Sequence, residues 1–141
     1  MISIIVLSKN KQLFFQFKNS LNRTIGLPYE IIYVDNLNNN YSIFQGYNAG
    51  ASNSKFSILI FAHEDIVFHS NNWGEVLLSY FESLCNPGVL GVAGSSYIPI
   101  SPSDWWVSNK GYLHSNFLSN DKNGLIGGGI LKQFGNQVPS C

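Results

Sequence analysis

The sequence predicts an α/β fold: a mostly parallel sheet flanked by helices, in a single domain. Three apolar runs, at residues 2–7, 30–34 and 57–61, are rich in β-branched side chains and do not alternate with polar residues. Such continuous runs are typical of strands that are buried on both faces of a parallel sheet. Segments with helical spacing of apolar residues separate the runs. Strand and helix therefore alternate, which is the order that places helices on the faces of a parallel sheet.

Each helical segment follows a residue that can cap a helix. Asn10 precedes the first segment and Ser42 the second, and the third begins after Asn72 and stops at an Asn-Pro-Gly turn. A fourth apolar run, at residues 89–93, predicts a weaker strand because a glycine interrupts it. From residue 95 onward Gly, Ser, Asn and Pro dominate between aromatic residues, and the pattern assigns few elements there.

Composition limits the classes of partner. The chain has 141 residues, enough for one domain with a hydrophobic core. Only 11% of the residues are charged, and the formal net charge is zero without any cluster of Lys and Arg. General binding to nucleic acid or anionic membrane depends on such clusters, so neither partner is expected.

Location is predicted from what the sequence lacks. The N-terminus has no basic region of a signal peptide, and no apolar run approaches the ~18 residues of a transmembrane segment. The two cysteines, Cys85 and Cys141, make no disulfide framework. A reduced, cytoplasmic setting is therefore expected.

Polar residues follow every predicted strand at its carboxyl end. They are Ser8-Lys9-Asn10, Asp35-Asn36, His63-Glu64-Asp65 and Ser95-Ser96. In open α/β sheets ligands bind in the crevice beyond the carboxyl ends of the strands, and a parallel sheet brings these ends to one edge. We therefore expect the four groups to face a ligand. Turn formation is the alternative explanation for Asp35, because Asp-Asn after a strand is ordinary turn chemistry.

Glu64 and Asp65 are the main candidates for a metal site. Adjacent carboxylates repel each other, and placing them beside a buried strand end costs free energy unless a cation or hydrogen-bond donors compensate. Mg²⁺ and Mn²⁺ favour oxygen ligands and use one or two protein carboxylates, with water and substrate phosphates completing the shell. Such an ion would neutralise a diphosphate and stabilise it as a leaving group.

A zinc hydrolase site is the alternative at the same segment. Its ligands would be His63, Asp65, His69 and His114. Two points weigh against it. A histidine placed like His69, after an apolar pair, is more often solvated than ligating. Neighbouring side chains at a strand end point to opposite faces, so His63 and Glu64 are expected to diverge.

Four segments together resemble the N-terminal part of a family 2-like glycosyltransferase with a GT-A (Rossmann-like) fold. They are ISIIVLSKN, EIIYVDN, YNAGASNSKFSILIFAHEDI and GVLGVAGSS, in this order within residues 1–96. The similarity is greatest to a small bacterial subgroup with a hydrophobic–His–x–Asp metal signature after the central strand. It implies a nucleotide-sugar (donor) binding half at residues 1–96. Because members of this family continue well past 141 residues, residues 97–141 would be a partial, truncated acceptor side.

The resemblance also implies roles for individual residues. The implied nucleotide-sugar-binding residues are Ser8, Asn10, Asp35, Asn36, Asn48, Gly50 and Glu64. Ser8 and Asp35 would lie near the base and the ribose, and Gly50 would permit close approach of the donor. Asp65 is the implied ligand of Mn²⁺ or Mg²⁺. Glu64 is a second metal ligand or a contact to the ribose.

Two departures from the family pattern bear on the mechanism. Ala62 or His63, depending on the alignment, stands where the Asp-x-Asp metal motif has its first Asp. The residues after 96 also offer few carboxylates for the general base that an inverting transferase needs beside the acceptor hydroxyl. Asp104 is the candidate, because Trp105 and Trp106 beside it offer a platform for a sugar ring. The same Trp pair is equally well explained as a cover of the sheet edge.

The leading hypothesis is a cytoplasmic, hexosyltransferase-like glycosyltransferase of bacterial polysaccharide biosynthesis. It would move a sugar from a UDP- or GDP-linked donor to a glycan or lipid-linked acceptor with the help of Mn²⁺ or Mg²⁺. The alternative is a nucleotide-sugar-binding remnant without transfer activity, since acceptor-side residues are few. The sequence leaves the sugar, the stereochemical outcome and the oligomeric state open.

Overall fold

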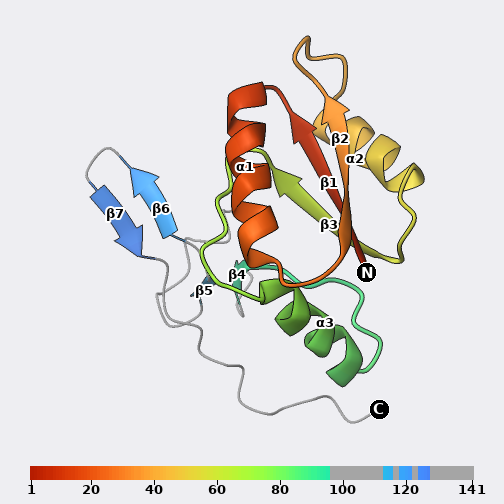
Figure 1. The fold of residues 1–141 in the computed structure, drawn as a ribbon, viewed down its shortest axis with the longest axis vertical. Helices are drawn as coiled ribbons and strands as arrows, with labels where there is room; N and C mark the ends of the chain where they lie inside the picture. Colours follow the sequence, from red (N-terminus) through yellow and green to blue (C-terminus); the bar gives the residue numbers. More distant parts are fainter. Residues whose placement is uncertain (96–112, 116–117, 122–123, 128–141) are drawn as a thin grey trace, which may run out of the picture. The chain divides into compact units, whose positions relative to one another are not determined.

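The computed structural model describes residues 1–95, 113–115, 118–121 and 124–127. Its contacts divide the chain into two compact units, Met1–Glu82 and Ser83–Cys141. The first unit holds a parallel sheet with its helices (Figure 1). The expected division into a donor half and an acceptor side at residue 96 concerns function and stays a prediction.

Three parallel strands form the sheet of the first unit. They are β1 (Ile2–Ser8), β2 (Tyr29–Asp35) and β3 (Ile58–His63), in the order β2-β1-β3. The register pairs the last residue of β1 with the last of β2, and Leu7 with His63. All three strands therefore end at the same edge, as their arrowheads show in Figure 1. The predicted α/β class and the three strands are confirmed.

The predicted caps begin the first two helices. Helix α1 (Lys11–Thr24) starts after Asn10, whose Oδ1 accepts hydrogen bonds from the backbone N–H groups of its second and third residues at 2.9 and 3.1 Å. Helix α2 (Ile43–Ser52) starts with a capping box between Ser42 and Gln45. These bonds satisfy backbone donors that the first turn of a helix leaves without partners.

Helices α1 and α2 cover opposite faces of the sheet, so that β1 is buried on both sides (Figure 1). The core on the α1 side consists of Ile2, Ile4, Val6, Phe17, Leu21, Ile25 and Ala62. On the other side α2 approaches β1 through two glycines. A Cβ on Gly46 would lie 2.5 Å from Leu7 Cδ1, and one on Gly50 would lie 2.3 Å from Ile5 Cγ2. The glycines therefore allow the helix to lie against the strand.

The segment after β3 is fastened to α1 before α3 (Trp73–Ser83) begins. Ser20 Oγ accepts a hydrogen bond from Phe68 N at 3.2 Å. The Phe68 ring packs on Phe17 and stacks on Trp73, with centroids 5.5 and 4.5 Å apart. Trp73 Nε1 donates to Thr24 Oγ1 at 3.1 Å. The chain that leaves β3 is thereby held to the core within a few residues.

The expected fourth strand is wrong. Residues 89–92 form no strand, and Val89 and Val92 are 89% and 71% exposed. Strand β4 (Ala93–Ser95) pairs antiparallel with β5 (Leu113–Ser115), and β6 (Leu118–Asp121) pairs antiparallel with β7 (Gly124–Gly127). Ser95 therefore lies in a different sheet from β1–β3, and Ser96 lies outside the described residues. An isolated apolar run with exposed side chains does not supply the burial that a central strand needs.

Two further expectations can be compared with the described residues. None of the helices in this part of the chain has the length and apolar character needed to cross a membrane. The expectation of reduced cysteines concerns Cys85 and Cys141, and it stays a prediction because Cys141 lies outside the described residues. The cytoplasmic location therefore stays a prediction.

Candidate functional site

A groove of about 460 Å³ lies at the edge where β1, β2 and β3 end. Its lining residues are Leu7, Lys9, Leu13, Asn36, Tyr41, Ser42, Ile43, His63, Glu64 and Asp65. They come from the ends of all three strands, the start of α1 and the loop that leads into α2. The predicted meeting of polar residues beyond the strand ends is thus found for three of the four groups.

A turn brings His63, Glu64 and Asp65 into the same groove. Strand β3 ends at His63, the next two residues form the turn, and Ile66 N donates to the His63 carbonyl at 3.4 Å. The expected divergence of His63 and Glu64 is therefore wrong, because strand alternation stops at His63. Both residues, with Asp65, line the groove.

The two carboxylates of this turn have different environments. Glu64 is partly buried, and its Oε1 accepts a hydrogen bond from Lys9 N at 2.9 Å. This bond joins the end of β3 to the chain leaving β1. Asp65 is exposed. Asp65 is therefore the more accessible ligand for a cation, while one Glu64 oxygen is already used to fasten the two strand ends.

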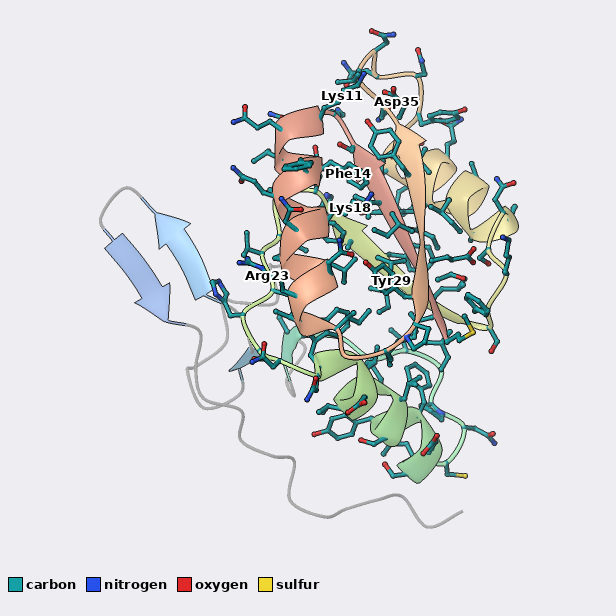
Figure 2. The ribbon with its side chains drawn as sticks, in the orientation of Figure 1. Lys11, Phe14, Lys18, Arg23, Tyr29 and Asp35 are labelled. Atoms are coloured by element: carbon teal, nitrogen blue, oxygen red, sulfur yellow. The ribbon has the colours of Figure 1, made fainter. Side chains whose placement is uncertain are left out.

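Asn36 holds the loop that forms one wall of the groove. Its side chain is 1% exposed, donates through Nδ2 to the Tyr41 carbonyl at 3.0 Å and accepts through Oδ1 from Tyr41 N at 2.9 Å. Asp35 is exposed at the carboxyl end of β2 (Figure 2), where its Oδ1 accepts from Leu37 N at 3.0 Å. The turn chemistry that was the alternative explanation for Asp35 is present, and it leaves Asp35 at the carboxyl edge of the sheet, where its contact with a ligand stays a prediction.

Ser8 and Asn10 stabilise the loop between β1 and α1. Ser8 is fully buried, and its Oγ lies 3.3 Å from both the backbone N and the carbonyl O of Asn10. The Asn10 side chain caps α1. Both residues therefore have structural partners, and their contact with a nucleotide stays a prediction.

Asn48 and Gly50 lie on α2 and do not line the groove. Asn48 is exposed, whereas Gly50 is buried against Ile5 and Val34. The glycine is explained by the approach of α2 to β1. The expected roles of Asn48 and Gly50 in donor binding stay predictions.

Tyr47 belongs to this region and was not selected from the sequence, whereas Lys9 was expected there only as a member of the Ser8-Lys9-Asn10 group and was given no role of its own. The Tyr47 hydroxyl donates to the Ala62 carbonyl at 3.2 Å, and its ring meets those of Phe61 and His63 edge-on, with centroids 5.3 and 6.2 Å apart. Partial burial raises the pKa of Tyr47, and the negative charges of Glu64 and Asp65 raise it further. In the sequence, the spacing of apolar residues in the segment that forms α2 indicated only that Tyr47 belongs to the core. Lys9 is the one lysine or arginine in the groove lining.

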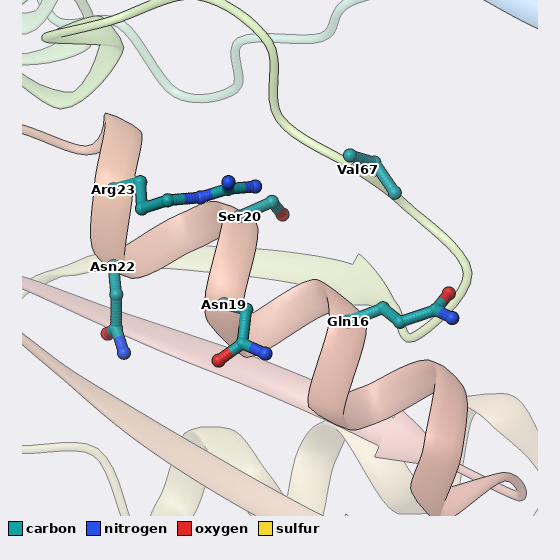
Figure 3. Close-up of a pocket in the computed structure, with 6 residues that line it drawn as sticks. All are labelled: Gln16, Asn19, Ser20, Asn22, Arg23 and Val67. Atoms are coloured by element: carbon teal, nitrogen blue, oxygen red, sulfur yellow. The ribbon is translucent and has the colours of Figure 1, made fainter.

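A second cavity, of about 570 Å³, lies on α1 (Figure 3). Gln16, Asn19, Ser20, Asn22 and Arg23 line it, with Val67 on the segment across from the helix. Although it is larger, it contains no carboxylate and lies along the outside of the helix. We assign the candidate site to the smaller groove, because that groove lies at the carboxyl edge of the sheet and combines a cation, an imidazole and two carboxylates.

The residues present fit an Mg²⁺ or Mn²⁺ site better than a zinc site. Within the described residues, no group of three or more His, Cys, Asp and Glu side chains could hold a metal. Structural and catalytic zinc sites use at least three protein ligands, whereas Mg²⁺ needs only one or two carboxylates beside phosphates and water. Asp65 with the second oxygen of Glu64 matches the latter chemistry. The side chain of His114 and all of Asp104 lie outside the described residues.

The sheet and its polar edge define an α/β domain of the GT-A type with a groove suited to a charged ligand. Residues 3–128 match the sequence model of a protein family described as the glycosyltransferase-like family, and the chain belongs to this family. The resemblance to family 2-like glycosyltransferases is thereby confirmed, and the chain is a transferase whose substrates are a sugar donor and an acceptor. No curated protein and no solved structure is significantly similar to the chain.

Proposed function

We propose that the groove at the carboxyl edge binds a nucleotide-diphosphate sugar and that the protein transfers this sugar with the help of Mn²⁺ or Mg²⁺. The observation that carries the proposal is the joint lining of one groove by Lys9, His63, Glu64 and Asp65. A lysine beside an exposed carboxylate provides one group for phosphate oxygens and one for the cation that accompanies them. Membership of the glycosyltransferase-like family supplies the reaction class.

The chain's own residues divide the work in the proposed site. Asp65 holds the metal, and Glu64 supports it while keeping β3 joined to the chain after β1. The Lys9 ammonium binds the diphosphate. A cation held by Asp65 and Glu64 would supply neutralisation of the charge that develops on the leaving diphosphate. Asp35, at the end of β2, binds the ribose or the base of a UDP- or GDP-linked donor.

The acceptor side is proposed on the sequence alone. Asp104 is the candidate base that takes the proton of an acceptor hydroxyl, and the acceptor is a glycan or a lipid-linked sugar. A hexosyl donor and a place in polysaccharide synthesis follow from the family resemblance. The groove itself consists of residues 7–65, so donor binding can be tested separately from transfer.

Calorimetry with UDP and GDP, with and without Mn²⁺, tests the proposal. We expect one of the nucleotides to bind more tightly when Mn²⁺ is present, because Asp65 would hold the cation that accompanies the phosphates. Asp65→Ala abolishes this enhancement, while Glu82→Gln, at an exposed carboxylate outside the groove, retains it. The absence of nucleotide binding at every metal concentration contradicts the proposed function. Binding without any sugar transfer or donor hydrolysis supports the donor site and contradicts the transfer step.

A further inference from the structure

Tyr47 contacts the strand end that leads into the candidate metal ligands. Its hydroxyl donates to the carbonyl of Ala62, the residue before His63, at 3.2 Å. Its ring lies edge-on to His63 at 6.2 Å and to Phe61 at 5.3 Å. One side chain on α2 thus touches three consecutive residues at the end of β3.

These contacts matter because β3 is an outer strand of the described sheet. In the order β2-β1-β3, only β1 forms backbone pairs with β3, and the pairing stops at Leu7 and His63. Beyond that point Glu64 is held to Lys9 N by one hydrogen bond, and within the described residues the His63 side chain makes no hydrogen bond. Tyr47 supplies the contact on the α2 face, with a ring that has few rotatable bonds and is itself partly buried.

Helix α2 is in turn fixed to the sheet independently of Tyr47. Gly46 and Gly50 place the helix against Leu7 and Ile5, and the capping box of Ser42 holds its first turn. The packing of α2 on the core therefore determines where the Tyr47 ring lies. The ring can in turn fix the position of the strand end that it contacts.

We infer that Tyr47 is a positioning residue, which fixes the His63–Asp65 turn so that Asp65 presents its carboxylate to the groove. The inference rests on the proposed function for its effect on donor binding. The ring and the hydroxyl contribute separately. The hydroxyl holds the Ala62 carbonyl, and the ring limits the orientations of the His63 imidazole.

The test compares Tyr47→Phe and Tyr47→Leu with a matched control. Tyr29→Phe also removes a hydroxyl that donates a hydrogen bond, to Asn22, but at the opposite end of β2 from Asp35 (Figure 2). We expect Tyr47→Leu to weaken Mn²⁺-dependent UDP or GDP binding about tenfold, since loss of a group that orients metal ligands typically costs 10–100-fold in affinity. Tyr47→Phe loses one neutral hydrogen bond, worth about a factor of three. Tyr29→Phe leaves binding unchanged.

A second readout needs no ligand. At fixed pH, the ring C–H resonance of His63 reports the aromatic ring beside it. We expect it to shift in Tyr47→Leu, to stay near its wild-type position in Tyr47→Phe and to be unaffected in Tyr29→Phe. A purely structural role would lower the melting temperature without moving this resonance selectively. An unchanged His63 resonance in Tyr47→Leu overturns the inference.

The two readouts separate the two ideas. If the wild-type protein binds neither nucleotide, the proposed function fails, while the His63 resonance still decides whether Tyr47 orients the turn. If the wild type binds and Tyr47→Leu binds equally well, Tyr47 has no positioning role and the donor site stands. Equal weakening in Tyr29→Phe and Tyr47→Phe also overturns the inference, because it indicates a general loss of stability.

Discussion

Substitution of Gly50 by alanine tests how closely α2 lies against the sheet. A Cβ at this position would be 2.3 Å from Ile5 Cγ2 and 3.3 Å from Val34 Cγ2. Ile5 is β-branched and fully buried in the central strand, so its methyl group cannot rotate away without disturbing the core. Either the helix or the strand has to move.

The expected loss follows from two opposing terms. Overpacking of a core costs about 1–3 kcal/mol. Replacing Gly by Ala in a helix returns roughly 1 kcal/mol of helix propensity. We therefore expect Gly50→Ala to lower the free energy of unfolding by up to about 2 kcal/mol, and each kcal/mol corresponds to a fall in melting temperature of roughly 4 °C for a domain of this size.

Thermal and urea unfolding of matched variants measure this loss. Gly88→Ala is the control, because a Cβ there meets nothing within 4 Å, and its effect should stay within about 0.5 kcal/mol. Ile5→Ala removes the methyl group that the new Cβ would meet. In that background the overpacking cost of Gly50→Ala should largely disappear, which gives a coupling energy of about 1–3 kcal/mol. A rise in stability for Gly50→Ala alone would refute the close packing and restore a ligand as the reason for the glycine.

Two further stability predictions concern a cap and a carboxylate network. Asn10→Ala should destabilise the protein by about 1 kcal/mol in urea unfolding, because Gln12 N and Leu13 N lose their acceptor. Asn10→Ser should recover most of this loss, because serine is also a good N-cap. Equal stability of the two variants would contradict the capping role. Hydrogen bonds from Ser3 Oγ and Lys55 N lower the pKa of Glu30 below its ordinary value of 4.5. Because the folded pKa is the lower one, the carboxylate stabilises the fold above pH 4.5, and this contribution is lost as the pH falls through the folded pKa. Unfolding experiments across this acidic range should show a weaker pH dependence for Glu30→Gln than for the wild type, and identical profiles would be inconsistent with the network.

The elements that could be predicted from the sequence are those determined by interactions between residues close together in the chain. The three continuous apolar runs became β1–β3, and Asn10 and Ser42 cap the helices that follow them. Capping needs only the side chain and the next three residues, so the sequence carries the whole signal. The run at residues 89–93 was predicted as a strand from its apolar residues alone. An apolar run does not show whether a neighbouring strand is available for backbone pairing.

The edge that forms the groove was predictable from topology, whereas the role of each residue there was not. Parallel strands must end together, so the meeting of Asn36, just after β2, with the His63–Asp65 segment in one groove followed from strand order. The Glu64–Lys9 bond joins residues 55 positions apart, and Tyr47 reaches Ala62 across 15 positions. Such contacts depend on the packed arrangement of α2 and β1–β3 and leave no periodic trace in the sequence.

The location of the donor site is tested most directly by Mn²⁺-induced line broadening in the amide NMR spectrum, recorded with a saturating nucleotide. A bound Mn²⁺ broadens the signals of nearby amides. The groove at the carboxyl edge predicts that Lys9, His63, Glu64 and Asp65 lose intensity first, while Asn19 and Arg23 in the cavity on α1 remain sharp. Broadening centred on Asn19 and Arg23, or equal broadening throughout the chain, would contradict the assignment of the donor site to this groove.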